Sequence, residues 1–168
     1  FLVQLEDGTI VETSLRGRFR LKGIRSTNPV EVGDVVKVEG ESIVEIEPRK
    51  NYIIRKSSNL SKESHILAAN IDQVFLVVTI KKPETPFEFI DRFLLTANAY
   101  HIPVVIVLNK VDILDEDEMA LAEAIKGLYE TNLGYKVVFS STVTGEGVDE
   151  VRLMLKDKLS LFSGNSGV

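Results

Sequence analysis

The chain has 168 residues, with 44% apolar and 27% charged residues and a formal net charge of −5. This composition is typical of a soluble globular protein. The absence of cysteine excludes a disulfide framework and a Cys-ligated zinc site in this stretch. No apolar run approaches the ~20 residues that a membrane helix needs, and the opening FLVQLEDG has no secretion-signal pattern. We therefore expect a cytoplasmic protein without a membrane partner, and the missing initiator Met suggests a trimmed or incompletely given start.

Charge is distributed unevenly along the chain. Residues 1–60 carry a net charge of +1 and residues 61–168 carry −6. This asymmetry predicts two modules with different partners. The polar, turn-rich segment SSNLSKES, residues 57–64, is the expected boundary between them.

The first module, residues 1–57, has the pattern of an all-β fold. VQLEDGTIVETSL places a D-G turn between two short alternating runs, which predicts a hairpin. RGRFRLKGIR alternates strictly, and VEVGDVVKVEGESIVEIEP contains further short strands. About five closely spaced strands predict a small barrel of the OB-fold type.

The strictly alternating strand carries a row of cations. Side chains at every second position of a strand share one face. An ordinary solvated outer face would explain the row, but like charges repel one another and a polyanion would relieve that repulsion. OB barrels commonly bind nucleic acid through a basic groove, so we expect this segment to bind RNA through Arg16, Arg18, Arg20, Lys22 and Arg25.

The second module, residues 66–168, alternates strands with helices. We expect strands at 73–80, 104–108 and 135–141, and helices at 86–102, 115–134 and 147–159. This alternation predicts an α/β fold with a parallel sheet covered by helices. Ligands of such sheets bind at the carboxyl ends of the strands.

The segment VVIVLNKVD ends a buried strand with Asn-Lys-x-Asp. Asp112 can accept both N1–H and N2–H of guanine as a bidentate pair, and paired charge-assisted bonds are strong. Asn109 can hold the loop and contact the base edge. The stem of Lys110 can cover the ring while its ammonium stays in water. The alternative is an ordinary polar turn, but the position after a buried strand favours a guanine site.

A second segment, SSTVTGEGVDEV, follows the next expected strand. It is similar to the S-A-x segment that GTPases place beside the base, with Thr142 where Ala is common. We expect Ser141 and Thr142 to lie beside guanine, with a backbone N–H at this turn meeting the guanine O6. An ordinary strand-to-helix turn is the alternative interpretation.

The phosphate-binding loop is not upstream of these motifs. No complete G-x-x-x-x-G-K-S/T motif exists in the chain, yet the last residues match its first five positions after the apolar segment KLSLF. A flexible Gly/Ser tail is the alternative. We interpret these residues as the start of a P-loop whose glycines let backbone N–H groups surround phosphate: Gly164, Asn165, Ser166, Gly167 and Val168. The order of the motifs then predicts a circularly permuted GTPase domain that is incomplete here.

The motif order resembles the RsgA (YjeQ) family of ribosome-small-subunit-dependent GTPases. The matching pieces are NIDQV at 70–74, FIDRFL at 89–94, NKVD at 109–112 and SGNSGV at 163–168. The resemblance implies an N-terminal OB-fold, a permuted P-loop GTPase domain and a C-terminal zinc-binding domain outside this chain. It further implies GTP and GDP binding, Mg²⁺ with the nucleotide, GTP hydrolysis stimulated by the 30S subunit, and a role in late 30S maturation with 16S rRNA as partner.

The same resemblance places the P-loop Lys, the switch segments and the magnesium-coordinating Asp motif beyond Val168. We therefore assign no catalytic residue and no metal ligand in this chain, and we expect the fragment alone to be inactive and the protein to be monomeric. Two other functions stay open: an RNA-binding OB module with a degenerate nucleotide fold, and another permuted ribosome-assembly GTPase. The residues after Val168 would distinguish a GTPase from an RNA-binding module with a degenerate nucleotide fold. The barrel expected at residues 1–56 argues against another permuted ribosome-assembly GTPase.

Overall fold

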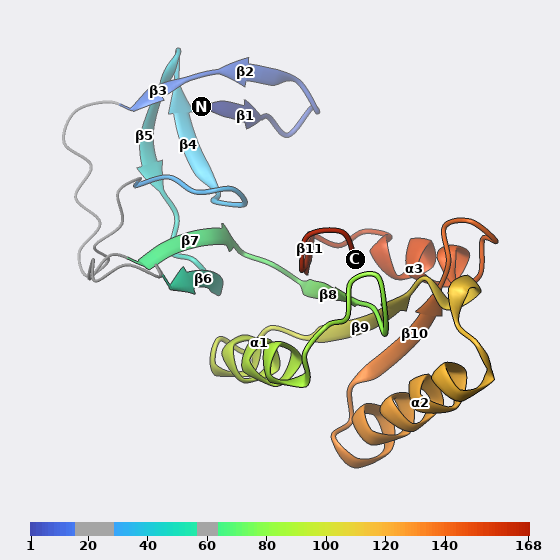
Figure 1. The fold of residues 1–168 in the computed structure, drawn as a ribbon. Coiled ribbons are helices and arrows are strands. Elements are labelled where there is room, and N and C mark those ends of the chain that lie inside the picture. The colour runs from blue at the N-terminus through green and yellow to red at the C-terminus, as the bar shows by residue number, and fades with distance from the viewer. Residues whose placement is uncertain (16–28, 57–63) are drawn as a thin grey trace. The chain divides into compact units, whose positions relative to one another are not determined.

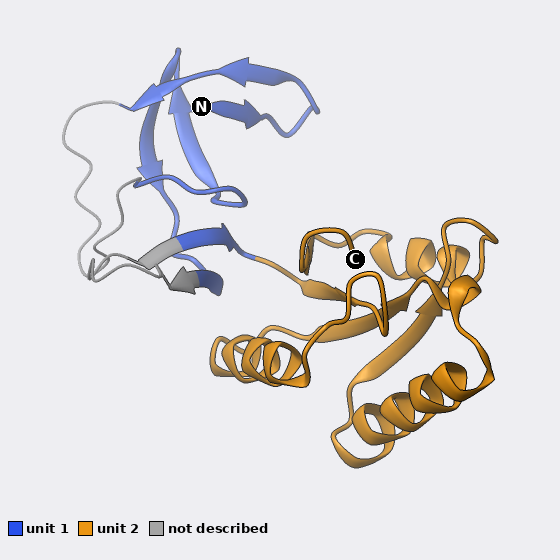
Figure 2. Ribbon diagram, in the orientation of Figure 1, with its two compact units in different colours: residues 1–70 blue, residues 71–168 orange. Residues whose placement is uncertain are grey.

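The computed structural model describes residues 1–15, 29–56 and 64–168. The chain folds into two compact units, residues 1–70 and 71–168 (Figure 2). The boundary expected at 57–64 differs from this division, because residues 64–69 form a strand that pairs within the first unit. The two units are described separately below.

The first unit begins with the predicted hairpin. Strands β1 (Leu2–Gln4) and β2 (Ile10–Glu12) pair antiparallel. The turn between them contains Gly8 at φ 85° and the Asp7 carboxylate, which accepts from the Thr9 amide at 2.9 Å. The D-G hairpin is therefore confirmed, with the glycine in the left-handed conformation that such turns favour.

Five further strands complete the described part of this unit. Strands β3 (Ser14–Leu15), β4 (Val36–Glu39) and β5 (Ser42–Ile46) form a sheet in the order β3-β5-β4. Strands β6 (Tyr52–Lys56) and β7 (Ser64–Ala69) pair antiparallel and were not predicted. The cationic segment with Arg16, Arg18, Arg20, Lys22 and Arg25 lies outside the described residues.

The second unit is the predicted α/β sheet (Figure 1). Its four strands are all parallel and lie in the order β10-β9-β8-β11. The elements in chain order are β8 (Gln73–Val78), α1 (Phe87–Ala99), β9 (Val104–Asn109), a 3₁₀ turn (Val111–Ile113), α2 (Glu116–Gly127), β10 (Lys136–Ser140), α3 (Val148–Leu155) and β11 (Ser160–Gly164). Each expected strand and helix is present.

The core explains the apolar strand runs. Helices α1 and α2 lie on one face of the sheet and α3 lies on the other (Figure 1), so β8 and β9 are covered on both sides and have no polar face. Phe75, Val105 and Val107 pack toward Val151 and Met154 of α3. Phe75 also stacks on Phe162 of β11, with ring centroids 4.9 Å apart.

The helix expected at 115–134 has two parts. Its start is a capping box, in which Asp115 accepts from the Glu118 amide and Glu118 accepts from the Asp115 amide. The α-helix ends at Gly127, and residues Leu128–Asn132 form a π-helical turn. Tyr129 in this turn is buried and donates a hydrogen bond to Asp91 of α1 at 2.9 Å.

Within the described ranges, no helix has the length and apolar character required to cross a lipid bilayer.

Candidate nucleotide-binding site

The carboxyl ends of all four parallel strands lie at one edge of the sheet. In the strand register, Ser140 of β10 is opposite Asn109 of β9, and Gly164 of β11 is opposite Val77 of β8. The three loops singled out in the sequence follow β9, β10 and β11. The topology therefore brings the expected base-binding residues and the start of the expected phosphate loop to the same edge.

The loop after β9 turns sharply at Lys110. This residue has φ 62° and ψ 36°, in the left-handed region, and it precedes the 3₁₀ turn. Val111 is 3% exposed and anchors the turn in the core, whereas the next residue, Asp112, is exposed at the surface. The alternation of a buried and an exposed residue directs the Asp112 carboxylate outward at the strand edge.

A buried hydroxyl orients that carboxylate. Ser141 is fully buried, and its Oγ donates to Asp112 Oδ1 at 2.5 Å. The same Oγ accepts from the amides of Val143 and Thr144 at 3.1 and 3.2 Å. A hydroxyl has one donor and two acceptor positions, so all of its hydrogen-bonding capacity is used. No described residue donates to the second Asp112 oxygen, so this oxygen can accept from a ligand.

The turn after β10 leaves the backbone amides of Thr142 and Gly147 without an acceptor among the described residues. The amide of Ser141 donates to the Glu146 carbonyl and that of Gly145 to the Ser141 carbonyl, while the amides of Val143 and Thr144 donate to Ser141 Oγ. No described residue accepts from the amide of Thr142, which is an exposed residue. Thr142 is more exposed than Gly147, so its amide is the candidate for the backbone donor that the sequence predicts in this turn.

Ser140 is a site residue that the sequence reasoning missed. Its Oγ donates to Asn109 Oδ1 at 3.3 Å, across the β9–β10 pair. This contact holds the Asn109 carbonyl oxygen and turns the amide nitrogen away from it. The double serine at the end of β10 was a usable signal, because neighbouring residues at a strand end face two different loops.

The T-G-E-G segment makes a close turn back against β10. Gly147 has φ 67°, and a Cβ atom there would lie 1.9 Å from the Phe139 carbonyl oxygen. No L-residue other than glycine fits this position without moving the backbone. This close approach places the start of α3 directly beside the loop that contains Ser141.

The loop after β11 is bound by Lys110 from the loop after β9. Lys110 Nζ donates to the Gly167 carbonyl at 2.5 Å and to the Lys82 carbonyl at 2.6 Å. Both hydrogen bonds are exposed, and the third donor of the ammonium is not used by either carbonyl. At Gly164, a Cβ atom would lie 2.5 Å from the Val77 carbonyl oxygen, which explains glycine at the first loop position.

A family model and curated relatives with the same name both match this chain. The family model described as RsgA GTPase matches residues 46–168. A relative from Bacteroides fragilis (strain ATCC 25285), named small ribosomal subunit biogenesis GTPase RsgA, is 57% identical over 100% of this chain and 56% of its own length. A relative of the same name from Flavobacterium johnsoniae is 47% identical over 100% of this chain and 54% of its own length. The chain thus spans about half the length of these curated relatives.

Two crystal structures are similar to the chain. YjeQ from Thermotoga maritima superposes with a TM-score of 0.76 at 35% identity, over 96% of this chain and 54% of that one. YloQ, described as a circularly permuted GTPase, gives a TM-score of 0.67 at 28% identity, over 99% of this chain and 55% of that one. With the family model covering well over half of its residues, this chain belongs to the RsgA GTPase family.

Proposed function

We propose that the protein is a guanine-nucleotide-binding GTPase that acts in biogenesis of the small ribosomal subunit. The relatives that match the whole chain are named for that role. The observation that carries the proposal is the exposed Asp112 carboxylate, held by the buried Ser141 hydroxyl at the strand edge. Its geometry suits a ligand that offers two adjacent N–H donors.

Recognition of guanine would use groups from two loops. Asp112 would accept from N1–H and the exocyclic amine, and the unpartnered amide of Thr142 would donate to O6. Asn109, held through its oxygen by Ser140, would present its amide nitrogen to the acceptor side of the base. An adenine ring presents the opposite pattern at these atoms, so with ATP the site would leave these polar groups without base partners.

Phosphate binding would begin at residues Gly164 to Val168. In this proposal the domain is a circularly permuted P-loop fold, with the base loops first and the phosphate loop last. Mg²⁺ would accompany the nucleotide, since it is usually bound through substrate phosphates and few carboxylates. In phosphoryl transfer the protein mainly positions groups and stabilises charge. This chain supplies the base contacts and the start of the phosphate cradle, and no hydrolytic residue is assigned within it.

The nucleotide preference tests the proposal most directly. In the full-length gene product, Asp112→Asn should weaken GTP binding and improve binding of xanthosine nucleotides, which carry a carbonyl where guanine has its amine. Sites that hydrogen-bond a substrate group reject analogues without it by up to about 10⁴-fold. Isothermal titration calorimetry with GTP, GDP, XTP and ATP measures this. Asp117→Asn, an exposed acid in the first turn of α2, is the matched control. Equal affinity of the unmodified protein for ATP and GTP would contradict the proposal.

We also propose that residues 1–57 form an OB-fold barrel that binds 16S rRNA on the 30S subunit, with the protein acting as a cytoplasmic monomer. The support is the positive balance of residues 1–60 and the alternating cations at Arg16, Arg18, Arg20 and Lys22, followed by Arg25. Binding through phosphates releases counterions, so affinity should fall steeply with salt. The acidic remainder of the chain would confine this contact to the first module.

Charge reversal tests the RNA-binding proposal. Arg18→Glu with Arg20→Glu should weaken 30S association and flatten its salt dependence while leaving GTP affinity unchanged. Lys37→Glu with Lys156→Glu changes the net charge equally at two exposed positions outside the cationic row and serves as control. Co-sedimentation with 30S subunits at several salt concentrations measures both. Wild-type affinity and salt slope in the Arg18 and Arg20 double variant would rule the idea out.

A further inference from the structure

The loop between β8 and α1, residues 79–85, is closed by its own hydrogen bonds. The Thr79 amide donates to Thr85 Oγ1 at 3.0 Å, and the Thr85 amide donates to the Thr79 carbonyl at 3.0 Å. Thr79 Oγ1 also donates to the Pro83 carbonyl at 2.5 Å. Both threonines are buried, so the loop base is anchored and only its tip at residues 81–83 projects from the sheet edge.

The tip of this loop contacts both halves of the candidate site. Lys82 has φ 54°, and its carbonyl accepts from Lys110 Nζ at 2.6 Å. Pro83 lies beside the phosphate loop, since a Cβ atom on Gly167 would be 3.7 Å from Pro83 Cδ. The loop therefore contacts Lys110, whose Nζ also bonds to the Gly167 carbonyl of the expected phosphate loop.

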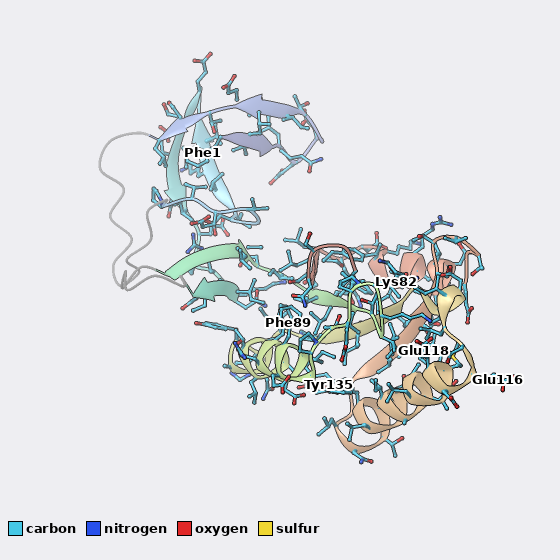
Figure 3. All side chains as sticks on the ribbon, in the orientation of Figure 1. Phe1, Lys82, Phe89, Glu116, Glu118 and Tyr135 are labelled. Atoms are coloured by element: carbon cyan, nitrogen blue, oxygen red, sulfur yellow. The ribbon has the colours of Figure 1, made fainter. Side chains whose placement is uncertain are left out.

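A side chain on the same tip anchors it to α2. Lys81 Nζ forms a salt bridge with Glu118 Oε2, and both side chains are 28% exposed. Glu118 is itself held by the capping box with Asp115 at the start of α2; Figure 3 labels Glu118 on this helix and Lys82 in the loop. The hydrogen bond from Lys81, and then that from the Asp115 amide, keep the pKa of Glu118 below its ordinary value.

Two adjacent residues thus hold the base loop from both of its ends. The Lys82 carbonyl holds Lys110 at the start of the loop, and Lys81 holds helix α2, whose N-cap residue Asp115 follows five residues later. We propose that Lys81 is a positioning residue for guanine-nucleotide binding. It fixes the loop whose Lys82 carbonyl places the Lys110 ammonium, and it touches neither base nor phosphate. This inference rests on the proposed guanine-nucleotide function.

The physical basis is preorganisation. A lysine side chain has many rotamers, and ordering it during binding reduces affinity. With Lys81 paired to Glu118, the Lys82 carbonyl is already in place before a nucleotide arrives. Without the ion pair, the hydrogen bonds between Thr79 and Thr85 remain, but the loop tip is no longer attached to α2. The Lys82 carbonyl is then less well fixed as an acceptor for Lys110.

The test is nucleotide binding by the full-length gene product, measured with a fluorescent GDP analogue. Lys81→Met keeps the aliphatic stem and removes the charge, and it should weaken binding about fivefold, the upper range for a partly exposed ion pair. The loss should appear as faster dissociation. Lys81→Arg, which keeps the charge and can still reach Glu118, should restore binding. Lys82→Ala keeps the carbonyl and should weaken binding less than Lys81→Met does.

Two controls separate positioning from general destabilisation. Lys136→Met breaks an ion pair with Glu150 that is about half exposed and lies between β10 and α3; it should leave GDP affinity unchanged. In an Asp112→Asn background, Lys81→Met should weaken the xanthosine diphosphate analogue by the same factor as GDP in the native background, because base selectivity resides in Asp112. A loss of GDP affinity in Lys81→Met that is absent in Lys136→Met, at a similar cost in unfolding free energy, distinguishes positioning from general destabilisation.

Unchanged GDP dissociation in Lys81→Met would overturn the inference, as would a loss equal to that of Lys136→Met. A larger loss in Lys82→Ala than in Lys81→Met would also overturn it, because the Lys82 ammonium would then be the contributing group. If the unmodified protein binds no guanine nucleotide, the proposed function itself fails. That result is distinguishable from the case in which wild type binds and the Lys81 variants bind equally well.

Discussion

The two units of this chain are stabilised by different kinds of contact. In the second unit, β8 and β9 are buried on both faces, and helices close over them. In the first unit the strands are two to six residues long, and exposed and half-buried residues alternate along β1, β2 and β4. A buried ion pair joins Arg49 to Asp34, with side chains 7% and 0% exposed. The comparison teaches that a continuous apolar core needs few specific polar contacts, whereas a unit with short strands depends on individual ones.

The largest effect is expected at Gly147 in the second unit. Gly147→Ala should lower the free energy of unfolding by about 4 kcal/mol, because a Cβ atom would lie 1.9 Å from the Phe139 carbonyl at a positive φ. Gly145→Ala has φ 86° but no atom within 4 Å, and should cost about 1 to 2 kcal/mol. Urea unfolding followed by circular dichroism measures both. Equal losses would show that backbone strain, and not the close approach, dominates this turn.

The next effect is expected at the ion pair of the first unit. Asp34 accepts from Arg49 Nε and Nη2, each at 2.6 Å, and from the Glu31 amide at 2.9 Å. Asp34→Asn should cost about 3 kcal/mol, because it leaves the Arg49 charge buried without a counter-ion. Thermal and urea unfolding of the variant check the value. A loss below about 0.5 kcal/mol, as for an exposed pair, would contradict the contrast drawn between the units.

A smaller effect is expected where a polar contact lies at the edge of the apolar core. Tyr129→Phe removes the hydrogen bond to Asp91 and should cost about 1.5 kcal/mol, as for a bond to a charged group. Burial, then the hydrogen bond and the charge of Asp91, raise the pKa of Tyr129.

This raised pKa predicts a pH dependence with a definite sign. The stability contributed by Tyr129 is fully present below about pH 10, the pKa of an unfolded tyrosine, and is lost as pH rises toward the higher folded-state pKa. Unfolding free energies measured at about pH 8, 10 and 11 should therefore fall more steeply in wild type than in Tyr129→Phe. Parallel curves would exclude the proposed linkage.

The smallest effect is expected at an exposed ion pair of α3. Arg152 Nη1 lies 2.6 Å from Asp149 Oδ1, and the two side chains are 73% and 85% exposed. Arg152→Ala should change the free energy of unfolding by less than about 0.5 kcal/mol, because solvent screens the charges and both side chains lose entropy on pairing. A loss comparable with that of Asp34→Asn would show that burial does not decide the strength of such pairs here.

Sequence patterns were most informative in the second unit. Apolar runs such as QVFLVVTI and VVIVL predicted strands, and the alternation of strands and helices predicted a parallel sheet covered by helices, but not the order of the strands in it. The first unit was less predictable. The D-G hairpin was found, but the pairing of β6 with β7 was not, since short antiparallel strands acquire partners through contacts that local periodicity does not specify.

The sequence by itself determined which residues could form the candidate site: the Asn-Lys-x-Asp loop, the serine-rich turn and the glycine-rich end are local motifs with local chemistry. Only the tertiary structure decided how they combine. The parallel register places Ser140 opposite Asn109, the buried Ser141 hydroxyl reaches Asp112, and Lys110 bonds to two carbonyls 28 and 57 residues away in the chain. Such contacts depend on the order of the strands and on the path of the loops at the sheet edge. The spacing of residues within a single motif determines neither of these.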